Sequence, residues 1–143
     1  MKPLYRAFVV MILVILLTGC FYFHRPWSYP IAVKIVNNSL CFTLVGDRMV
    51  RQHTPKHNGF MLQKVFNGQY ELVWSTPGKP DNKFYPVKIS ECLPVEFDNW
   101  QAGEYILSTG VWFDGGIDNR YYRVKFTLTR DPLSNKLALM DVK

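Results

Sequence analysis

The sequence predicts an all-β fold, an antiparallel β-sandwich of about eight or nine short strands. Apolar side chains recur at every second position in segment after segment, which is the period of a strand with one buried face. Clusters of Asn, Gly, Asp, Ser and Pro separate these segments and are typical of turns. No window carries a helical stripe longer than two turns, so a parallel sheet with helical crossovers is disfavoured.

The strand pattern is clearest near the C-terminus, where Tyr122, Val124, Phe126 and Leu128 alternate with polar side chains. Such alternation places one face in the core and the other in water. The expected strands occupy residues 31–36, 39–45, 59–66, 68–75, 83–90, 93–97, 103–113, 120–130 and 135–142, with turns at 37–39, 67–68, 76–82, 114–119 and 131–134.

A bend is predicted at the entry to the strand 103–113, where Trp100 and Gly103 precede Tyr105. This arrangement resembles the tyrosine corner of immunoglobulin-like sandwiches, in which a tyrosine hydroxyl closes the preceding bend onto the backbone. Antibody domains carry a cysteine two residues after this tyrosine, whereas Leu107 stands here. The resemblance therefore implies an immunoglobulin-like fold class and nothing more.

The first residues have the pattern of an export signal. Residues 1–6 carry two basic side chains and no acid, eleven apolar residues follow at 7–17, and the small residues Thr18 and Gly19 come next. A spanning helix needs about 20 apolar residues, which favours a cleaved signal peptide. An uncleaved anchor stays open as the alternative, because the apolar window can be extended to seventeen residues at Phe23.

Residues Leu17-Thr18-Gly19-Cys20 resemble the lipobox of bacterial lipoproteins. The resemblance implies a signal peptide at 1–19, an acylated Cys20 within a tether at 20–29, and a sandwich domain at 30–143. Each buried CH₂ of an acyl chain adds about 0.8 kcal/mol of membrane affinity. Phe21, rather than an aspartate, follows the cysteine, which favours the outer membrane over the inner one.

The charge of the chain from Cys20 onward is mildly basic. Without Lys2 and Arg6, 15 basic side chains stand against 11 acidic ones, a net charge of +4. The basic residues are scattered along the chain rather than clustered. We therefore expect no nucleic-acid partner.

Two further cysteines, Cys41 and Cys92, form an even pair in a chain that carries an export signal. A disulfide between them would close a loop of about 50 residues and stabilise the fold by about 4 kcal/mol. Two buried free thiols are the alternative. Neither cysteine belongs to a CxxC motif, so a redox enzyme is not expected.

Candidate catalytic and metal-binding residues do not form a recognisable motif. His53 and His57 are four apart, but the proline and the Asn-Gly pair around them predict a solvated loop. Glu96 and Asp98 are two apart, which is typical of the wet face of an edge strand. Residues 113–119 hold two aspartates and two glycines, a composition that fits a hairpin tip better than a calcium loop. We expect no enzyme activity, no catalytic residue, no metal and no cofactor.

Aromatic side chains beside the 114–119 turn are the predicted partner-binding residues. Trp112 is out of phase with Val111, and Tyr121 is out of phase with Tyr122, so both leave the buried face of their strands. With Arg120 they would suit recognition of a protein or a sugar. Packing of the two rings against a neighbouring loop or second sheet is the alternative.

A family resemblance covers most of residues 28–130. The lipobox leader, "SLCFTLV", the second cysteine in "KISECLPVEF", "GEYILSTGVWF" and a final basic strand resemble type VI secretion immunity periplasmic lipoproteins of Gram-negative bacteria. The resemblance implies a periplasmic, lipid-anchored binding protein that neutralises a protein toxin by direct contact. The alternative is an accessory or structural envelope lipoprotein whose immunoglobulin-like module binds another envelope protein or a glycan.

Overall fold

The structure is a computed structural model that describes residues 8–9, 11–12, 27–46, 48–76, 84–114 and 119–143. The expected lipidation site Cys20, most of the signal peptide and tether, and the tip at 115–118 lie outside the described residues. Among the residues that are described, no helix is both long and apolar enough to cross a bilayer.

The all-β prediction is confirmed. The strands are β1 (Tyr29–Val36), β2 (Ser39–Leu44), β3 (Pro55–Phe66), β4 (Gln69–Ser75), β5 (Tyr85–Pro86), β6 (Gly103–Phe113), β7 (Asn119–Arg130) and β8 (Leu137–Val142), with a short helix, α2 (Arg48–Gln52), after β2. They form one sheet in the order β2-β1-β7-β6-β3-β4, in which β5 pairs with β3 and β8 pairs with β7. All pairs are antiparallel except β1 with β7, which is parallel and brief.

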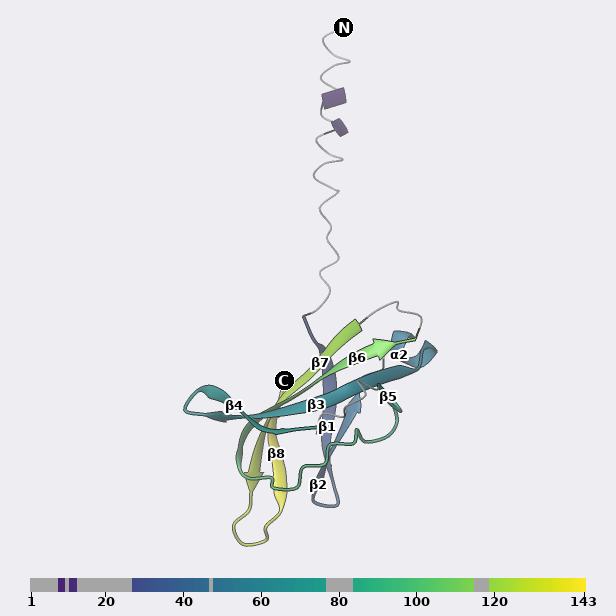
Figure 1. Ribbon diagram of the computed structural model, residues 1–143. Coiled ribbons are helices and arrows are strands. Elements are labelled where there is room, and N and C mark those ends of the chain that lie inside the picture. The colour runs from purple at the N-terminus through teal and green to yellow at the C-terminus, as the bar shows by residue number, and fades with distance from the viewer. Residues whose placement is uncertain (1–7, 10, 13–26, 47, 77–83, 115–118) are drawn as a thin grey trace.

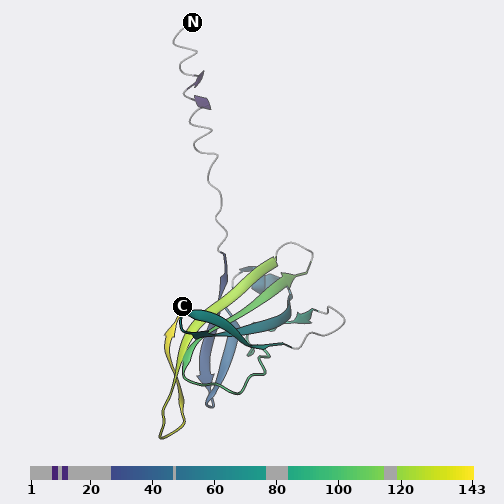
Figure 2. The same cartoon turned by 60° about the vertical axis from the view of Figure 1, so that its left-hand side comes forward.

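Two layers enclose the core. The long strands β3, β6 and β7 lie side by side, and the β1–β2 hairpin runs steeply across them (Figures 1 and 2). Side chains from the two layers meet in an aromatic cluster, where the Phe42 ring centroid of β2 lies 5.5 Å from that of Phe126 of β7. Trp100, from the segment before β6, lies 6.0 Å from both rings. The sheet therefore has an inner face, which packs on the hairpin, and an outer face.

The predicted tyrosine corner is present. The hydroxyl of Tyr105 donates to the carbonyl oxygen of Gln101 at 3.0 Å and accepts from the N–H of Gln101 at 3.2 Å. The ring also stacks on Phe126, with 5.7 Å between centroids. One side chain thus fixes the bend before β6 to the core.

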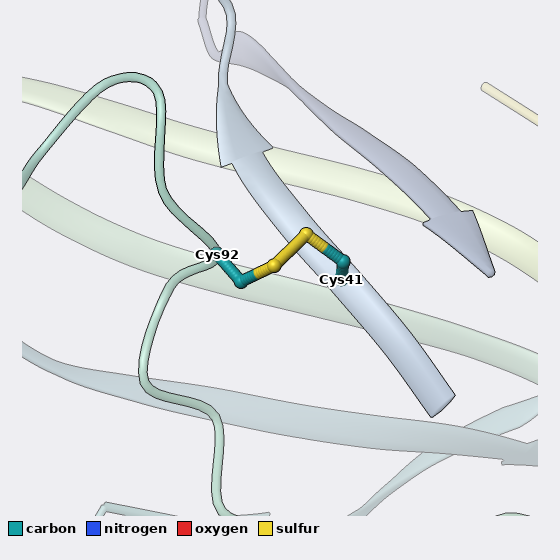
Figure 3. Close-up of a disulfide and its surroundings, with 2 residues drawn as sticks. All are labelled: Cys41 and Cys92. Atoms are coloured by element: carbon teal, nitrogen blue, oxygen red, sulfur yellow. A yellow bond between two sulfur atoms is a disulfide. The ribbon is translucent and has the colours of Figure 1, made fainter. Parts of the chain in front are cut away.

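The predicted disulfide joins Cys41 and Cys92, whose Cα atoms are 5.1 Å apart across a separation of 51 residues. Figure 3 shows the bridge reaching from β2 to the loop after β5. Beside it, the N–H of Leu93 donates to the carbonyl oxygen of Phe42 at 2.7 Å. Together these bonds attach the segment 93–97 to the hairpin.

Two predicted segments differ from the structure. The strand expected at 83–90 is reduced to β5, and the strand expected at 93–97 is extended chain outside the sheet. Leu93 is buried and Val95 is half-buried, whereas Pro94 and Glu96 are exposed, so the period of two reflects burial without strand pairing. Pro94 lacks the N–H that a central strand must donate, which accounts for the lost pairing at 93–97.

The solvated loop predicted around His57 is also wrong, because β3 already begins at Pro55. The register of β3 against β6 shifts between His57 and Phe60, which marks a bulge. Gly59 has φ +129° there, a conformation that side-chain-bearing residues rarely adopt. The Asn-Gly pair therefore forms a bulge inside a strand rather than a loop.

Candidate functional site

The outer face of the sheet exposes several large apolar side chains. Met61 of β3 is 48% exposed and Tyr121 of β7 is 44% exposed, and the exposed Tyr70 and Leu72 of β4 extend the surface to the sheet edge. On this face, residues of β3 and β7 stand opposite those of β6, so their side chains converge. An open apolar sheet face with a depression in it is a candidate contact surface.

A hollow of about 350 Å³ opens in the outer face, and we call it the outer hollow. Its lining includes Asn58, Met61, Thr76, Ser108, Gly110, Trp112 and Tyr121. Gly110 makes room for the indole ring of Trp112, because a Cβ atom at this position would lie 2.9 Å from Cη2 of that ring. The indole ring therefore lies against the backbone of Gly110, and its other neighbour is Phe84, with 4.7 Å between ring centroids.

Ser108 gives the outer hollow a polar group. Its side chain is 2% exposed, and its Oγ atom has no hydrogen-bond partner within the described part of the chain. A buried hydroxyl without a partner costs about 1–3 kcal/mol, so a ligand atom that bonds to it would recover that energy. Ser108 is not among the residues predicted from the sequence, although its position two residues before Gly110 on the same strand face is a usable signal.

The three predicted partner-binding residues are not brought together. Trp112 and Tyr121 both line the outer hollow, as their phase in the strands predicted. Arg120 instead points to the inner face and is only 9% exposed. Its guanidinium carbon lies 4.3 Å from the ring centroid of Tyr29 and 5.4 Å from that of Phe113. Arg120 therefore packs beside the core and does not supply a cation to the outer face.

Charged groups on the outer face are mostly paired. Lys56 lies 2.9 Å from Asp114, and Lys125 lies 2.9 Å from Glu104. Arg123, which is opposite Ser108 in the ladder, is exposed and has no ion pair among the described residues. The hydrogen bond and charge of Glu104 raise the pKa of Lys125. Arg123 is thus the cation available to an acidic group on a partner.

A second hollow, of about 500 Å³, lies where the edge of the sheet faces the segment 93–97, and we call it the edge hollow. Among the residues that the structure describes, its lining is formed by His57, Trp74, Thr76, Tyr85, Pro86, Pro94 and Glu96. Three aromatic rings and two prolines make it largely apolar. The sheet edge supplies the rings, and the segment attached by the disulfide supplies Pro94 and Glu96.

His57 is the buried polar residue of the edge hollow. It is 4% exposed, and its ring lies between those of Phe60 and Tyr85, at centroid distances of 4.4 and 5.8 Å. The N–H of Gly59 donates to Nδ1 at 3.0 Å, so the neutral ring carries its proton on Nε2. Burial lowers the pKa of His57, because the charged form loses its hydration.

His57 and Glu96 share this hollow although they lie far apart in the sequence. His53 and Asp98 are not part of its lining. Over the described ranges, no three His, Cys, Asp or Glu side chains lie close enough together to hold a metal ion. The arrangement is one of aromatic surfaces with polar groups among them, including the imidazole of His57 and the carboxylate of Glu96.

Comparison with known proteins gives no relative: no family model matches the chain, and neither curated proteins nor solved structures yield a match.

Proposed function

We propose that the protein is a lipid-anchored periplasmic binding protein that acts by direct contact, as an immunity protein that neutralises a type VI secretion toxin. The observation that carries the binding role is the outer hollow. Trp112 and Tyr121 flank a buried Ser108 hydroxyl that has no partner in the described structure, on a sheet face whose apolar side chains are exposed. Interface hot spots are rich in Trp and Tyr that surround pockets of this kind.

The scaffold beneath the outer hollow supports the same role. The tyrosine corner, the disulfide and the aromatic cluster on Phe42 hold the sheet in one arrangement. A preformed binding surface spends less free energy on ordering when it meets a partner. Contact alone would suffice for neutralisation, so the role needs no catalytic group.

The place of action follows from the leader. The lipobox-like residues before Cys20 support export and acylation, and the type VI immunity assignment rests on the strand and cysteine motifs that resemble that family. Arg123 beside the outer hollow favours an acidic surface on the toxin. An accessory envelope lipoprotein is the second candidate, and the aromatic edge hollow favours a glycan ligand for it.

Co-expression with the neighbouring effector gene tests the proposal. We expect the full chain to rescue cells from the effector and to be captured with it from periplasmic extract. Trp112→Ala and Tyr121→Ala should each weaken the complex by roughly 2 kcal/mol, about 30-fold in dissociation constant, as for hot-spot aromatics.

Phe66→Ala is the matched control, because Phe66 is exposed to a similar extent as Tyr121 but has the opposite phase to Met61 in β3 and does not line the outer hollow. The toxin should bind this variant as it binds the native chain. If Trp112→Ala and Tyr121→Ala both bind the toxin with native affinity, the outer hollow is not the contact surface. If the full chain does not protect cells from the effector, the immunity function is excluded.

A further inference from the structure

We infer that the edge hollow is a saccharide-binding site, separate from the outer hollow and from the contact with a toxin. It is the larger of the two hollows, it is lined mainly by aromatic and proline side chains, and it contains one buried polar ring. Small-ligand sites have this composition, with a few polar groups that set orientation.

The aromatic walls are suited to the apolar C–H face of a pyranose ring. Trp74 stands opposite Leu62 in the β3–β4 ladder and packs against the core, so its indole is held in place. Tyr85 stands opposite His57 in the β3–β5 pair, which fixes the second ring. Rings that are already immobilised lose little conformational entropy when a ligand stacks on them.

The polar groups of the edge hollow require a ligand that both accepts and donates hydrogen bonds. Nδ1 of His57 is occupied by the Gly59 amide, so the Nε2–H is the donor that remains for the hollow. Glu96 is exposed, lines the same hollow and has no ion pair in the described structure, which makes its carboxylate the acceptor. A hydroxyl group can accept from His57 and donate to Glu96.

Charged ligands fit this pair of groups less well. An anion would be repelled by the carboxylate of Glu96, and a cation would leave the N–H of His57 without an acceptor. Adjacent hydroxyls on an apolar ring are the defining chemistry of sugars, and they satisfy the donor, the acceptor and the aromatic walls together. The volume of about 500 Å³ lies within the range of small-ligand sites and admits a short oligosaccharide.

Titration calorimetry of the full chain in detergent, with cellotriose and chitotriose as the probes, tests the inference. We expect at least one of the two to bind with a dissociation constant of about 1 mM or lower. Glu96→Ala, an exposed position where the fold tolerates change, should weaken this binding at least tenfold. His57→Phe keeps a ring but removes the N–H donor, and it should weaken binding to a similar extent.

Trp112→Ala is the control, because Trp112 lines the outer hollow and is not among the described residues that line the edge hollow. Its saccharide affinity should equal that of the native chain. The inference is overturned if neither trisaccharide binds, if Glu96→Ala binds as the native chain does, or if Trp112→Ala abolishes binding. Toxin capture by Glu96→Ala should be unchanged, so failure of the saccharide site and failure of the proposed immunity function give different results.

Discussion

At the scale of single residues, His57 shows how burial changes the chemistry of a side chain. Its ring is held between Phe60 and Tyr85, and its Nδ1 accepts the amide of Gly59 in the β3 bulge. The fold therefore favours the neutral imidazole, and the pKa lies below the ordinary value of 6.5. Of the charged and titratable groups, Tyr85 and Glu96 share the hollow with it.

The lowered pKa of His57 predicts a pH dependence of stability. The unfolded chain binds the proton more tightly than the native one, so the free energy of unfolding falls as pH drops from about 6.5 through the folded pKa. Well above pH 6.5, His57 is neutral in the native and the unfolded chain, so the stability that its burial favours is fully present. Urea titrations of the native chain and of His57→Phe between about pH 5 and 7.5 should show a smaller pH slope in the variant. Equal slopes would mean that His57 titrates as it does in the unfolded chain.

At the scale of elements, β6 derives its position from the bend before it. Tyr105 closes this bend through two hydrogen bonds to Gln101 while its ring stacks on Phe126. Lys64, on the neighbouring strand β3, lies 5.3 Å from the centroid of the Tyr105 ring. The corner therefore joins the entry of β6 to both of its neighbours.

Removing the hydroxyl from this corner tests its contribution. Tyr105→Phe keeps the ring packing and loses both hydrogen bonds to Gln101, so the free energy of unfolding should fall by roughly 1–3 kcal/mol. Tyr70→Phe, at an exposed position, should change it by less than about 0.5 kcal/mol. Urea denaturation followed by tryptophan fluorescence measures both. A Tyr105→Phe variant as stable as the native chain would show that the bend holds without the hydroxyl.

Elements with strict alternation could be predicted from the sequence, and those shaped by proline or glycine could not. The positions of Trp112 and Tyr121 on the outer face could be predicted, because side chains alternate between the two faces along β6 and β7. The same parity places Arg120 with Tyr122 on the inner face, where it lies over Tyr29. The prediction that grouped Arg120 with Trp112 and Tyr121 is therefore wrong, because Arg120 alternates with Tyr121 in β7.

The edge hollow depends on tertiary placement that no local pattern contains. His57 reaches it because a bulge interrupts β3, and Glu96 reaches it because the segment 93–97 packs outside the sheet. The Asn-Gly pair and the prolines predict loops from the sequence alone. The backbone preferences of these residues suit bulges and extended segments equally well, so the sequence does not distinguish these structures. The contribution of a residue to this site is therefore visible only in the folded chain.

At the scale of the whole molecule, the disulfide connects β2 to the segment 93–97, which has no strand pairing to the sheet. The segment 93–97 belongs to no strand, and besides its packing it is attached to β2 by Cys92 and by the amide of Leu93. The disulfide thus stabilises one wall of the edge hollow as well as the fold.

Replacement of both cysteines should lower the stability of the fold and the affinity for a trisaccharide, and the two effects can be measured separately. The Cys41→Ala/Cys92→Ala variant should lose about 2–5 kcal/mol of unfolding free energy, because the unfolded chain is no longer cross-linked. Trisaccharide affinity should fall as well, since Glu96 lies in the released segment. Urea denaturation and calorimetry measure the two effects, and the native chain in reducing agent serves as the comparison. Unchanged stability after removal of both thiols would contradict a structural role for the bridge.

The parallel contact between β1 and β7 has a consequence for orientation at the bilayer. It pairs Tyr29 with Tyr122, so β1 begins at the end of the sheet where β6 ends and β7 begins, beside the outer hollow (Figure 1). For a chain held by lipid at Cys20, the seven residues up to Trp27 reach at most about 25 Å. The outer hollow would then stay near the bilayer surface, because Tyr121, which lines it, is next to the strand partner of Tyr29.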